Sequence, residues 1–265
     1  MAHLLGQNRL MSISFDTLIE EGASADVSGW DFSWLNGRAT EERPPWRYAD
    51  RLAERLRAAS ASLDIQTGGG EVLATAGAFP PVAVATESWP PNIARATRLL
   101  HPRGVVVVAD PDEPPLPFAD ESFDLVTSRH PATIWWQEIA RVLQPGGTYF
   151  AQHVGPASAF ELIEFFLGPQ PEARLGRHPD REAAEAVGAG LEIVDLQTAS
   201  LRIEIHDVAA AVYLLRKVIW WVPGFTVEKY LDRLRDLHEL IQKEGPFVAH
   251  STRHLIEARV ASTAS

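Results

Sequence analysis

Residues 63–74, LDIQTGGGEVLA, place three consecutive glycines just after a short apolar run that contains an acid, Asp64. A glycine backbone can turn sharply and can be approached closely by a ligand. A helix expected from about residue 71 would direct its free N–H groups and the positive end of its dipole at the same place. The segment is therefore typical of a loop that binds a ligand through its backbone.

Two common glycine loops do not match this segment. In the dinucleotide fingerprint G-x-G-x-x-G, Leu73 would occupy the position of the third glycine. A phosphate-binding P-loop requires a Lys followed by Ser or Thr, and neither follows here. Glu71 beside the turn would also repel a pyrophosphate. These features favour a ligand with a neutral or cationic group near the loop.

Acids follow the next two strand-like runs. Glu87 ends VAVATE, and one carboxylate at that point can accept hydrogen bonds from two hydroxyl groups of a ligand. Asp110 ends GVVVVAD, and Asp112 stands two residues later, so either can present its carboxylate to a ligand. Pro111 between them has no N–H and cannot donate a hydrogen bond to that ligand.

Histidines stand at the ends of two later strand-like runs, His130 in TSRHP and His153 in AQHVG. Either histidine can accept a proton, hold a substrate by hydrogen bonds, or only form hydrogen bonds with nearby backbone. We expect at least one in the pocket. His206 is a weaker candidate for the site. The other histidines are expected to be surface or structural residues: His101, His178, His238, His250 and His254. No cluster of oxygen ligands is visible in SRHPAT, so no metal site is expected.

The elements that must position these residues alternate along the chain. Strand-like runs lie at residues 62–66, 82–86, 104–110, 123–128, 148–154, 191–197 and 248–260, with helical patterns between them. This alternation predicts a doubly wound, mostly parallel α/β sheet of seven strands with helices on both faces. Ligands of such sheets bind beyond the carboxyl ends of the strands, where the strand order reverses.

Four segments are expected. Residues 1–44 form an arm, irregular over 12–42, that packs on the body because Trp30, Phe32 and Trp34 are costly to leave in water. Residues 45–206 form the core. Residues 207–246 form a helical insertion, either a lid over the sheet's carboxyl edge or a hairpin that completes the core. Residues 247–265 supply the last strand and the tail.

Composition narrows the partners. The 265 residues carry a formal charge of −11, so nucleic acids and membrane surfaces are not expected to bind. Cysteine is absent, which excludes disulfides and thiolate nucleophiles. No signal peptide is visible, and a cytoplasmic protein is expected.

Together these segments resemble class I S-adenosylmethionine-dependent methyltransferases over about residues 45–155, in particular the small-molecule branch that includes menaquinone- and ubiquinone-biosynthesis-like enzymes. The family motif acid–apolar–G-x-G-x-G corresponds to residues 64–70, with Gln66 in place of its first glycine. The stretches LPFADESFDLVTSRH and EIARVLQPGGTYF also resemble segments of the superfamily. The resemblance implies the Rossmann-like methyltransferase fold, with S-adenosylmethionine as cofactor.

The resemblance also implies which residues contact the ligands. Those expected at the cofactor are Asp64, Gln66, Thr67, Gly68, Gly70, Glu87, Ser88, Asp110, Asp112 and Ser128. Those expected at a small, largely apolar or aromatic acceptor are Arg129, Trp34, Tyr48, Trp135 and Trp220, although the aromatic residues can equally serve only to join arm, insertion and body. His130 and His153 are the candidate bases. The altered Gln66 leaves a second hypothesis, a non-catalytic or repurposed cofactor-binding protein, whereas Leu73 disfavours a nicotinamide-dependent enzyme.

Overall fold

The computed structural model describes residues 13–262 of the chain. These residues divide into two compact units, which are described separately. The larger unit holds residues 29–31, 41–203 and 249–262, and the smaller one holds residues 13–28, 32–40 and 204–248. The expected arm and helical insertion therefore cluster together, except that residues 29–31 and 41–44 of the arm belong to the larger unit. The larger unit holds the expected core and the last strand, except for residues 204–206 and 247–248, which belong to the smaller unit.

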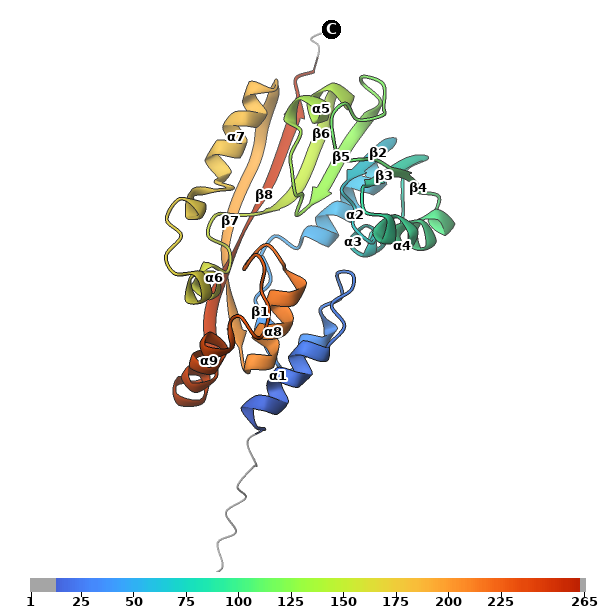
Figure 1. Ribbon diagram of the computed structural model, residues 1–265. Helices are drawn as coiled ribbons and strands as arrows, with labels where there is room; N and C mark the ends of the chain where they lie inside the picture. Colours follow the sequence, from blue (N-terminus) through green and yellow to red (C-terminus); the bar gives the residue numbers. More distant parts are fainter. Residues whose placement is uncertain (1–12, 263–265) are drawn as a thin grey trace, which may run out of the picture. The chain divides into compact units, whose positions relative to one another are not determined.

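The sheet has the order β1-β7-β8-β6-β5-β2-β3-β4 (Figure 1). Its strands are β1 (Ala39–Glu41), β2 (Ala61–Ile65), β3 (Val82–Glu87), β4 (Val106–Ala109), β5 (Phe123–Arg129), β6 (Leu143–Val154), β7 (Leu191–Ile205) and β8 (Phe247–Val260). Strands β2 to β6 pair in parallel, and β8 runs antiparallel to β6 with Ala151 opposite Ile256. The doubly wound fold is confirmed. The described residues form eight strands instead of seven, because the three-residue β1 joins the edge beside β7.

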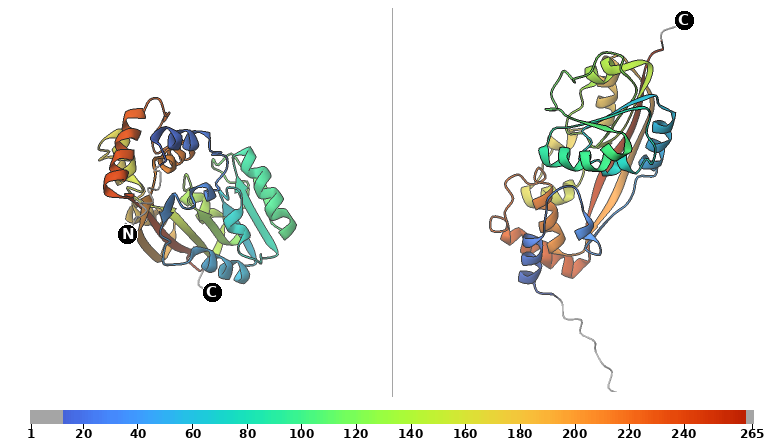
Figure 2. Two further views of the ribbon diagram at one scale, coloured as in Figure 1. Left: turned by 90° about the horizontal axis from the view of Figure 1, so that it is seen from below. Right: turned by 90° about the vertical axis from the view of Figure 1, so that its right-hand side faces the viewer.

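Helices pack on both faces of the sheet in the larger unit. One core joins α2 (Tyr48–Ala58), α3 (Glu71–Ala74) and α4 (Pro90–Leu100) to strand residues such as Leu125. The other joins α5 (Trp136–Val142) and α7 (Pro179–Gly188) to strand residues such as Val126. Consecutive strand residues point to opposite faces, so each strand supplies both cores. Figure 2 gives two further views of this sheet and its helices.

Local sequence explains how these helices begin and end. In α4, Pro90 and Pro91 occupy the first turn, where a missing N–H costs nothing. Asn92, Ala96 and Leu100 then repeat at four-residue spacing and are buried against the sheet. The chain continues into η2 (His101–Arg103) and turns at Gly104 with φ +85°. Between β6 and α7 lie α6 (Phe160–Leu167) and η3 (Ala173–Leu175).

The smaller unit is mostly helical. It contains α1 (Phe15–Ser24), η1 (Ser33–Leu35), α8 (Val208–Lys217) and α9 (Leu231–Glu244). The expectation of an irregular arm was wrong for α1, which Ser14 caps by accepting from the N–H of Thr17. Helix α1 packs on the buried α8, and a Cβ at Gly22 would lie 2.7 Å from the Ala209 carbonyl, so only glycine permits this approach. The lid role of the insertion stays a prediction.

The helices of residues 13–262 are all too short or too polar to cross a membrane.

Candidate active site

The predicted ligand site lies where the strand order reverses. β2 pairs with β3 on one side and with β5 on the other, although β5 is the third strand after β2 in the chain. The carboxyl ends of these strands deliver the glycine loop, Glu87 and Arg129 to the same edge of the sheet. The sequence-predicted cofactor residues of the larger unit are therefore brought together there.

The glycine loop needs glycine for two different reasons. Gly68 has φ +62° and Gly70 has φ +80°, conformations that residues with a side chain rarely adopt. At Gly70 an added Cβ would also lie 2.8 Å from the Leu100 side chain, so the loop packs tightly on α4. At Gly68 the nearest atom to such a Cβ belongs to Trp30, 3.9 Å away. On the side where a Cβ would stand, Gly68 therefore faces open space and one indole ring.

Glu71 is not the free acid that the sequence suggested. Its carboxylate pairs with the Arg95 guanidinium of α4 at 2.7 Å. This pairing weakens the electrostatic argument against a pyrophosphate. Leu73 is buried in the core between α3 and the sheet, so the steric argument against the dinucleotide fingerprint stands.

Glu87 connects the end of β3 to the glycine loop. Its buried carboxylate accepts the N–H of Gly68 at 2.7 Å through Oε2 and the N–H groups of Ser88 and Trp89 at 3.0 and 2.9 Å through Oε1. Oε1 therefore accepts two hydrogen bonds and Oε2 accepts one, so one lone-pair site remains, on Oε2. The arrangement fixes the carboxylate at the switch point and leaves one acceptor site for a ribose hydroxyl.

Asp64 lies behind the loop. Its carboxyl is buried and accepts the Thr127 hydroxyl at 2.5 Å, which ties β2 to β5. Burial raises the pKa of Asp64 to about 6, although the hydrogen bond from Thr127 works in the opposite direction. Thr67 holds the loop to β3 through its backbone N–H, 2.9 Å from the Thr86 carbonyl. Asp64 and Thr67 therefore hold the start of the glycine loop to the neighbouring strands β5 and β3.

Gln66, the residue in place of the family's first glycine, reaches across the site. Its backbone has φ +57°. Its side-chain Nε2 donates to Asp112 Oδ1 and to the Thr133 carbonyl, each at 2.8 Å, and its Oε1 accepts the N–H of Ala132 at 2.6 Å. One side chain therefore links the loops that follow β2, β4 and β5.

The two acids after β4 have different surroundings. Asp110 is buried, and its Oδ1 accepts the N–H of Asp112 at 2.9 Å, while its own N–H donates to the Glu87 carbonyl at 3.0 Å. These bonds hold Asp110 within its own turn. Asp112 is half-buried and directs its carboxylate to Gln66. Burial raises the pKa of Asp112, with the Gln66 hydrogen bond opposing the change.

Two residues that were expected to contact a ligand instead form hydrogen bonds within the core. Ser128 is buried and donates its hydroxyl to the Ile65 carbonyl at 2.9 Å. Tyr48 is buried, stacks on Phe150 at 5.2 Å and donates its hydroxyl to the Ser128 carbonyl at 3.1 Å. A role for Tyr48 in contacting the acceptor is therefore not retained. Ser128 remains beside the site, because it lines a small cavity under the segment 131–135.

His130 follows β5 with φ +57° and is half-buried. Its Nε2 lies 2.8 Å from Nε2 of Gln152, and the Gln152 Oε1 accepts the indole N–H of Trp46 at 2.8 Å. Since an indole N–H can only donate, the amide oxygen must face Trp46 and the amide N–H must face His130. His130 Nε2 is then the acceptor, and the proton of the neutral ring sits on Nδ1. Within the described part of the chain, Nδ1 has no hydrogen-bond partner.

The charge state of His130 agrees with this tautomer. Loss of hydration lowers the pKa of His130 well below its usual value, and the positive charges of Arg129 and Arg253 lower it further. The ring is therefore neutral near pH 7. Arg129, the last residue of β5, has an exposed side chain.

His153 lies elsewhere. It is fully buried on the face of the sheet that α5 and α7 cover, beside Trp136 and Tyr149. Its Nδ1 is 2.6 Å from Glu182 Oε2 and its Nε2 is 2.9 Å from the Tyr149 hydroxyl. Both nitrogens are thus occupied by the protein, and His153 is not retained as a candidate base. Strand alternation was the signal that could have shown this, because His153 and Gln152 must point to opposite faces.

The expected aromatic residues are divided between the two units. In the larger unit, the small cavity under the segment 131–135 is apolar and is lined by Ile65, Pro131, Ile134 and Trp135. In the smaller unit, Trp34 stacks on Tyr213 at 4.8 Å with the Arg38 guanidinium 4.7 Å from its ring. Trp220 is exposed within that unit. Contacts of Trp34 and Trp220 with an acceptor stay predictions. Trp30, beside the glycine loop, was not among the expected site residues.

Comparison with known proteins agrees with this geometry. Residues 63–151, from β2 to β6, match the sequence family described as methyltransferase domain. No characterised, curated protein matches the chain in sequence. The family match covers the glycine loop, Glu87, both β4 acids and His130.

Solved structures share the fold. A protein from Bacillus halodurans C-125 described as a candidate methyltransferase is 21% identical, with 80% of this chain and 99% of that chain covered and a TM-score of 0.56. A candidate sarcosine dimethylglycine methyltransferase from Galdieria sulphuraria is 18% identical, with 82% and 87% covered and a TM-score of 0.50. The 4+2 cyclase SpnF is 18% identical, with 82% and 81% covered and a TM-score of 0.50. At these identities the likeness concerns the fold alone.

Proposed function

We propose that the protein, whose residues 63–151 match the methyltransferase-domain family, uses S-adenosylmethionine to methylate a small, largely apolar acceptor at the carboxyl end of β5. The observation that carries the proposal is the Glu87 carboxylate, held at the switch point against the Gly68 N–H. The bound cofactor supplies an electrophilic methyl group on a sulfonium sulfur. The protein has to hold the two partners in line and keep water out.

Residues at three strand ends would hold the cofactor. Glu87 Oε2 has one acceptor site left for a ribose hydroxyl, a second hydroxyl would have to replace one of the three N–H groups on the carboxylate, and the glycine loop offers backbone to the amino-acid portion. Asp112 is the better of the two β4 acids for the adenine amino group, because the Asp110 carboxylate already binds the N–H of Asp112. Gln66 borders the same space and would have to exchange at least its bond with Asp112 as adenine binds.

The acceptor would meet a donor and a cation at the end of β5. The Gln152–Trp46 pair holds His130 as the tautomer with Nδ1–H, so His130 is prepared to donate a hydrogen bond and not to remove a proton through Nε2. Arg129 adds an exposed guanidinium beside it. Both groups would orient an oxygen of the acceptor that carries negative charge, such as a phenolate, enolate or carboxylate. An acceptor that arrives ionised needs no base.

The walls favour an apolar body on this acceptor. Pro131, Ile134 and Trp135 form an apolar border beside His130. Such a border excludes water and strengthens the hydrogen bonds made at its edge.

A repurposed cofactor-binding protein is the second candidate. It is supported by the bridge of Gln66 across the site and by the cyclase activity named for SpnF, which has this fold. In that case the protein would bind S-adenosylmethionine without consuming it.

Calorimetry and labelling would test the proposal. We expect the wild-type protein to bind S-adenosylhomocysteine and not NAD, and to transfer a methyl label from S-adenosylmethionine into a small molecule of a metabolite extract. Turnover in His130→Gln should fall while S-adenosylhomocysteine binding is unchanged, because His130 would touch only the acceptor. Failure to bind S-adenosylhomocysteine would refute the assignment of the site. Binding without any labelled product would favour the repurposed protein.

A further inference from the structure

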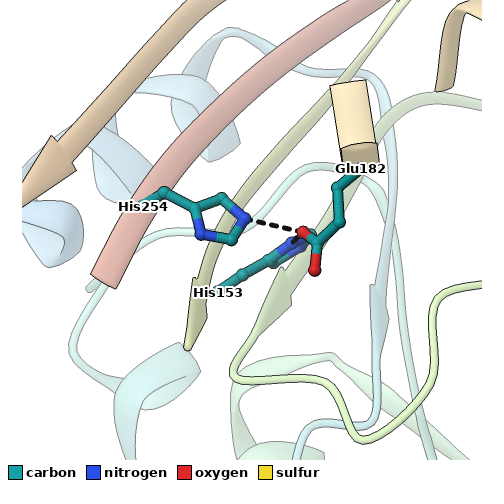
Figure 3. A group of neighbouring side chains, drawn as sticks. All are labelled: His153, Glu182 and His254. Carbon is teal, nitrogen blue, oxygen red and sulfur yellow. Dashed lines mark hydrogen bonds and ion pairs between the residues drawn. The ribbon is translucent and has the colours of Figure 1, made fainter. Parts of the chain in front are cut away.

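A buried cluster of three ionisable side chains lies outside the proposed methyl-transfer site. His153 comes from β6, Glu182 from α7 and His254 from β8, and the two histidines are fully buried (Figure 3). Both imidazole rings point at the same carboxylate oxygen, with His153 Nδ1 and His254 Nε2 each 2.6 Å from Glu182 Oε2. The sequence expectation that His254 is a surface or structural residue did not foresee this arrangement.

Proton positions in the cluster follow from its hydrogen bonds. An ionised carboxylate only accepts, so both histidines must donate to Glu182. Tyr149 then donates its hydroxyl to the remaining nitrogen of His153, at 2.9 Å.

An ionised Glu182 carboxylate is therefore buried between two imidazole N–H groups that donate to the same oxygen. Among the described residues, Glu182 forms ion-pair contacts only with these two histidines. A buried carboxylate without a cationic partner is costly, and a bound cation would remove that cost. The charge balance of the site is thus suited to a positive ion.

The donor atoms are those of a transition-metal site. Two imidazole nitrogens and a carboxylate are ligands that Zn²⁺ and related ions prefer, and the three donor atoms lie within 4.8 Å of one another. Within the described part of the chain, Glu182 Oε1 accepts no hydrogen bond, so the carboxylate can offer both oxygens and complete a four-coordinate set. Tetrahedral ligands about 2.1 Å from a metal lie about 3.4 Å apart, so the histidine nitrogens need to move from Oε2 by less than about 1 Å.

The surrounding residues allow the necessary change of tautomer. When His153 binds an ion through Nδ1, its proton moves to Nε2 and is donated to the Tyr149 oxygen, which is the kind of outer partner that orients a metal-binding histidine. Nδ1 of His254 is buried and has no hydrogen-bond partner among residues 13–262, so no donor at Nδ1 prevents the proton from moving there when Nε2 binds the ion. In each ring the proton only moves from one nitrogen to the other, and the imidazole stays neutral.

We propose that His153, Glu182 and His254 bind one divalent transition-metal ion of the zinc class, which fastens α7 to β6 and β8. The ion is structural, because the strand alternation that buries His153 directs it to the face covered by α5 and α7, away from His130 and its partner Gln152. The proposal departs from the sequence expectation that no metal is bound. It is independent of the methyl-transfer proposal.

Metal content and thermal unfolding test the proposal. The full chain is produced with zinc supplied, separated from free metal, and its zinc measured per chain. We expect about one zinc per chain, a visible d–d spectrum after Co²⁺ replacement, and a lower unfolding midpoint after prolonged exposure to EDTA that zinc restores. Glu182→Gln and His254→Gln should each lose about tenfold or more in zinc affinity.

A matched control separates this site from ordinary histidine binding. His250 and Glu161 form a similar pair, with Nδ1 and Oε1 2.8 Å apart, but the pair is partly exposed and has only two ligands. His250→Gln should retain the full zinc content. A wild-type protein that holds no zinc and shows no midpoint shift would overturn the proposal. Equal zinc content in the wild type, Glu182→Gln and His254→Gln would overturn it as well, because the ion would then sit elsewhere.

Discussion

Gln66 shows how one side chain can alter a shared loop while the loop keeps its path. The backbone adopts φ +57° as a glycine would, and the amide then uses its length to join the loops after β4 and β5. A residue with a Cβ pays roughly 1–2 kcal/mol in this conformation. The three side-chain hydrogen bonds offset that strain, each by about 1 kcal/mol.

Two substitutions separate strain from bridging. Gln66→Gly removes both, whereas Gln66→Ala removes the bridge and keeps the strain. We expect Gln66→Ala to be less stable than Gln66→Gly by about 1 kcal/mol, in contrast to the usual preference for alanine. Urea unfolding of the two variants measures this difference. Equal stability would mean that the loop relaxes to another conformation once the side chain is gone.

Glu87 provides the residue-scale prediction on binding. Glu87→Ala should weaken the binding of S-adenosylhomocysteine by about 1–3 kcal/mol, because a ribose hydroxyl and the Gly68 N–H lose a charged acceptor. Calorimetry on the folded variant measures the change. Glu71→Gln is the control, since Glu71 lies on the same loop but is paired with Arg95. If both variants bind like the wild type, the ribose is held by other groups.

At the scale of elements, the sequence predicted most of the strands and helices of the larger unit. Unbroken apolar runs such as VVVVA predicted strands, and the glycine loop predicted the place of the site. The expectation that this run is a buried strand was wrong, because β4 lies at the edge of the sheet and Val106 is exposed. Helix α1 was missed because FDTLIEEGAS is short and contains a glycine. The partners of Gln66 and the His153 cluster could not be predicted, because they depend on side chains brought together from separate elements.

The register of β5 and β6 gives an element-scale prediction. Arg129 pairs with Gln152, which places the Gln152 amide against His130. Gln152→Glu keeps the size of the side chain and still accepts from Trp46. A carboxylate favours the charged imidazole, so the pKa of His130 should rise in this variant. NMR titration of the His130 ring measures it.

The same variant should change the pH dependence of turnover. In the wild type the lowered pKa of His130 keeps the ring neutral, so its protonation should affect the rate only on the acid side of histidine's usual value of about 6.5. In Gln152→Glu the pH range in which protonation of His130 changes the rate should move towards higher pH. A His130 titration that is identical in the two proteins would show that Gln152 does not control the ring. Glu161→Gln, which alters a carboxylate near His250, should leave His130 unchanged.

For the molecule as a whole, two buried carboxylates on opposite faces of the sheet make opposite contributions to stability. Glu182 has its pKa lowered to about 2 from an ordinary 4.5, and Asp64 has its pKa raised to about 6 from 3.8. A lowered carboxyl pKa stabilises the fold above the unfolded value and loses this effect as pH falls. A raised one means that the folded state binds the extra proton, so its contribution falls as pH rises through this range.

Difference curves against two neutral variants should show both effects. We expect the stability advantage of the wild type over Glu182→Gln to be full above about pH 5 and to shrink as pH falls towards about 2. Relative to Asp64→Asn, the wild type should lose stability as pH rises from about 4 to about 6, because Asp64 then ionises in a buried position. Urea unfolding at a series of pH values, with EDTA present to exclude metal binding, gives both curves. Two difference curves with slopes of the same sign would contradict the assignment, since the unfolded chain would then bind protons at both sites in the same sense relative to the fold.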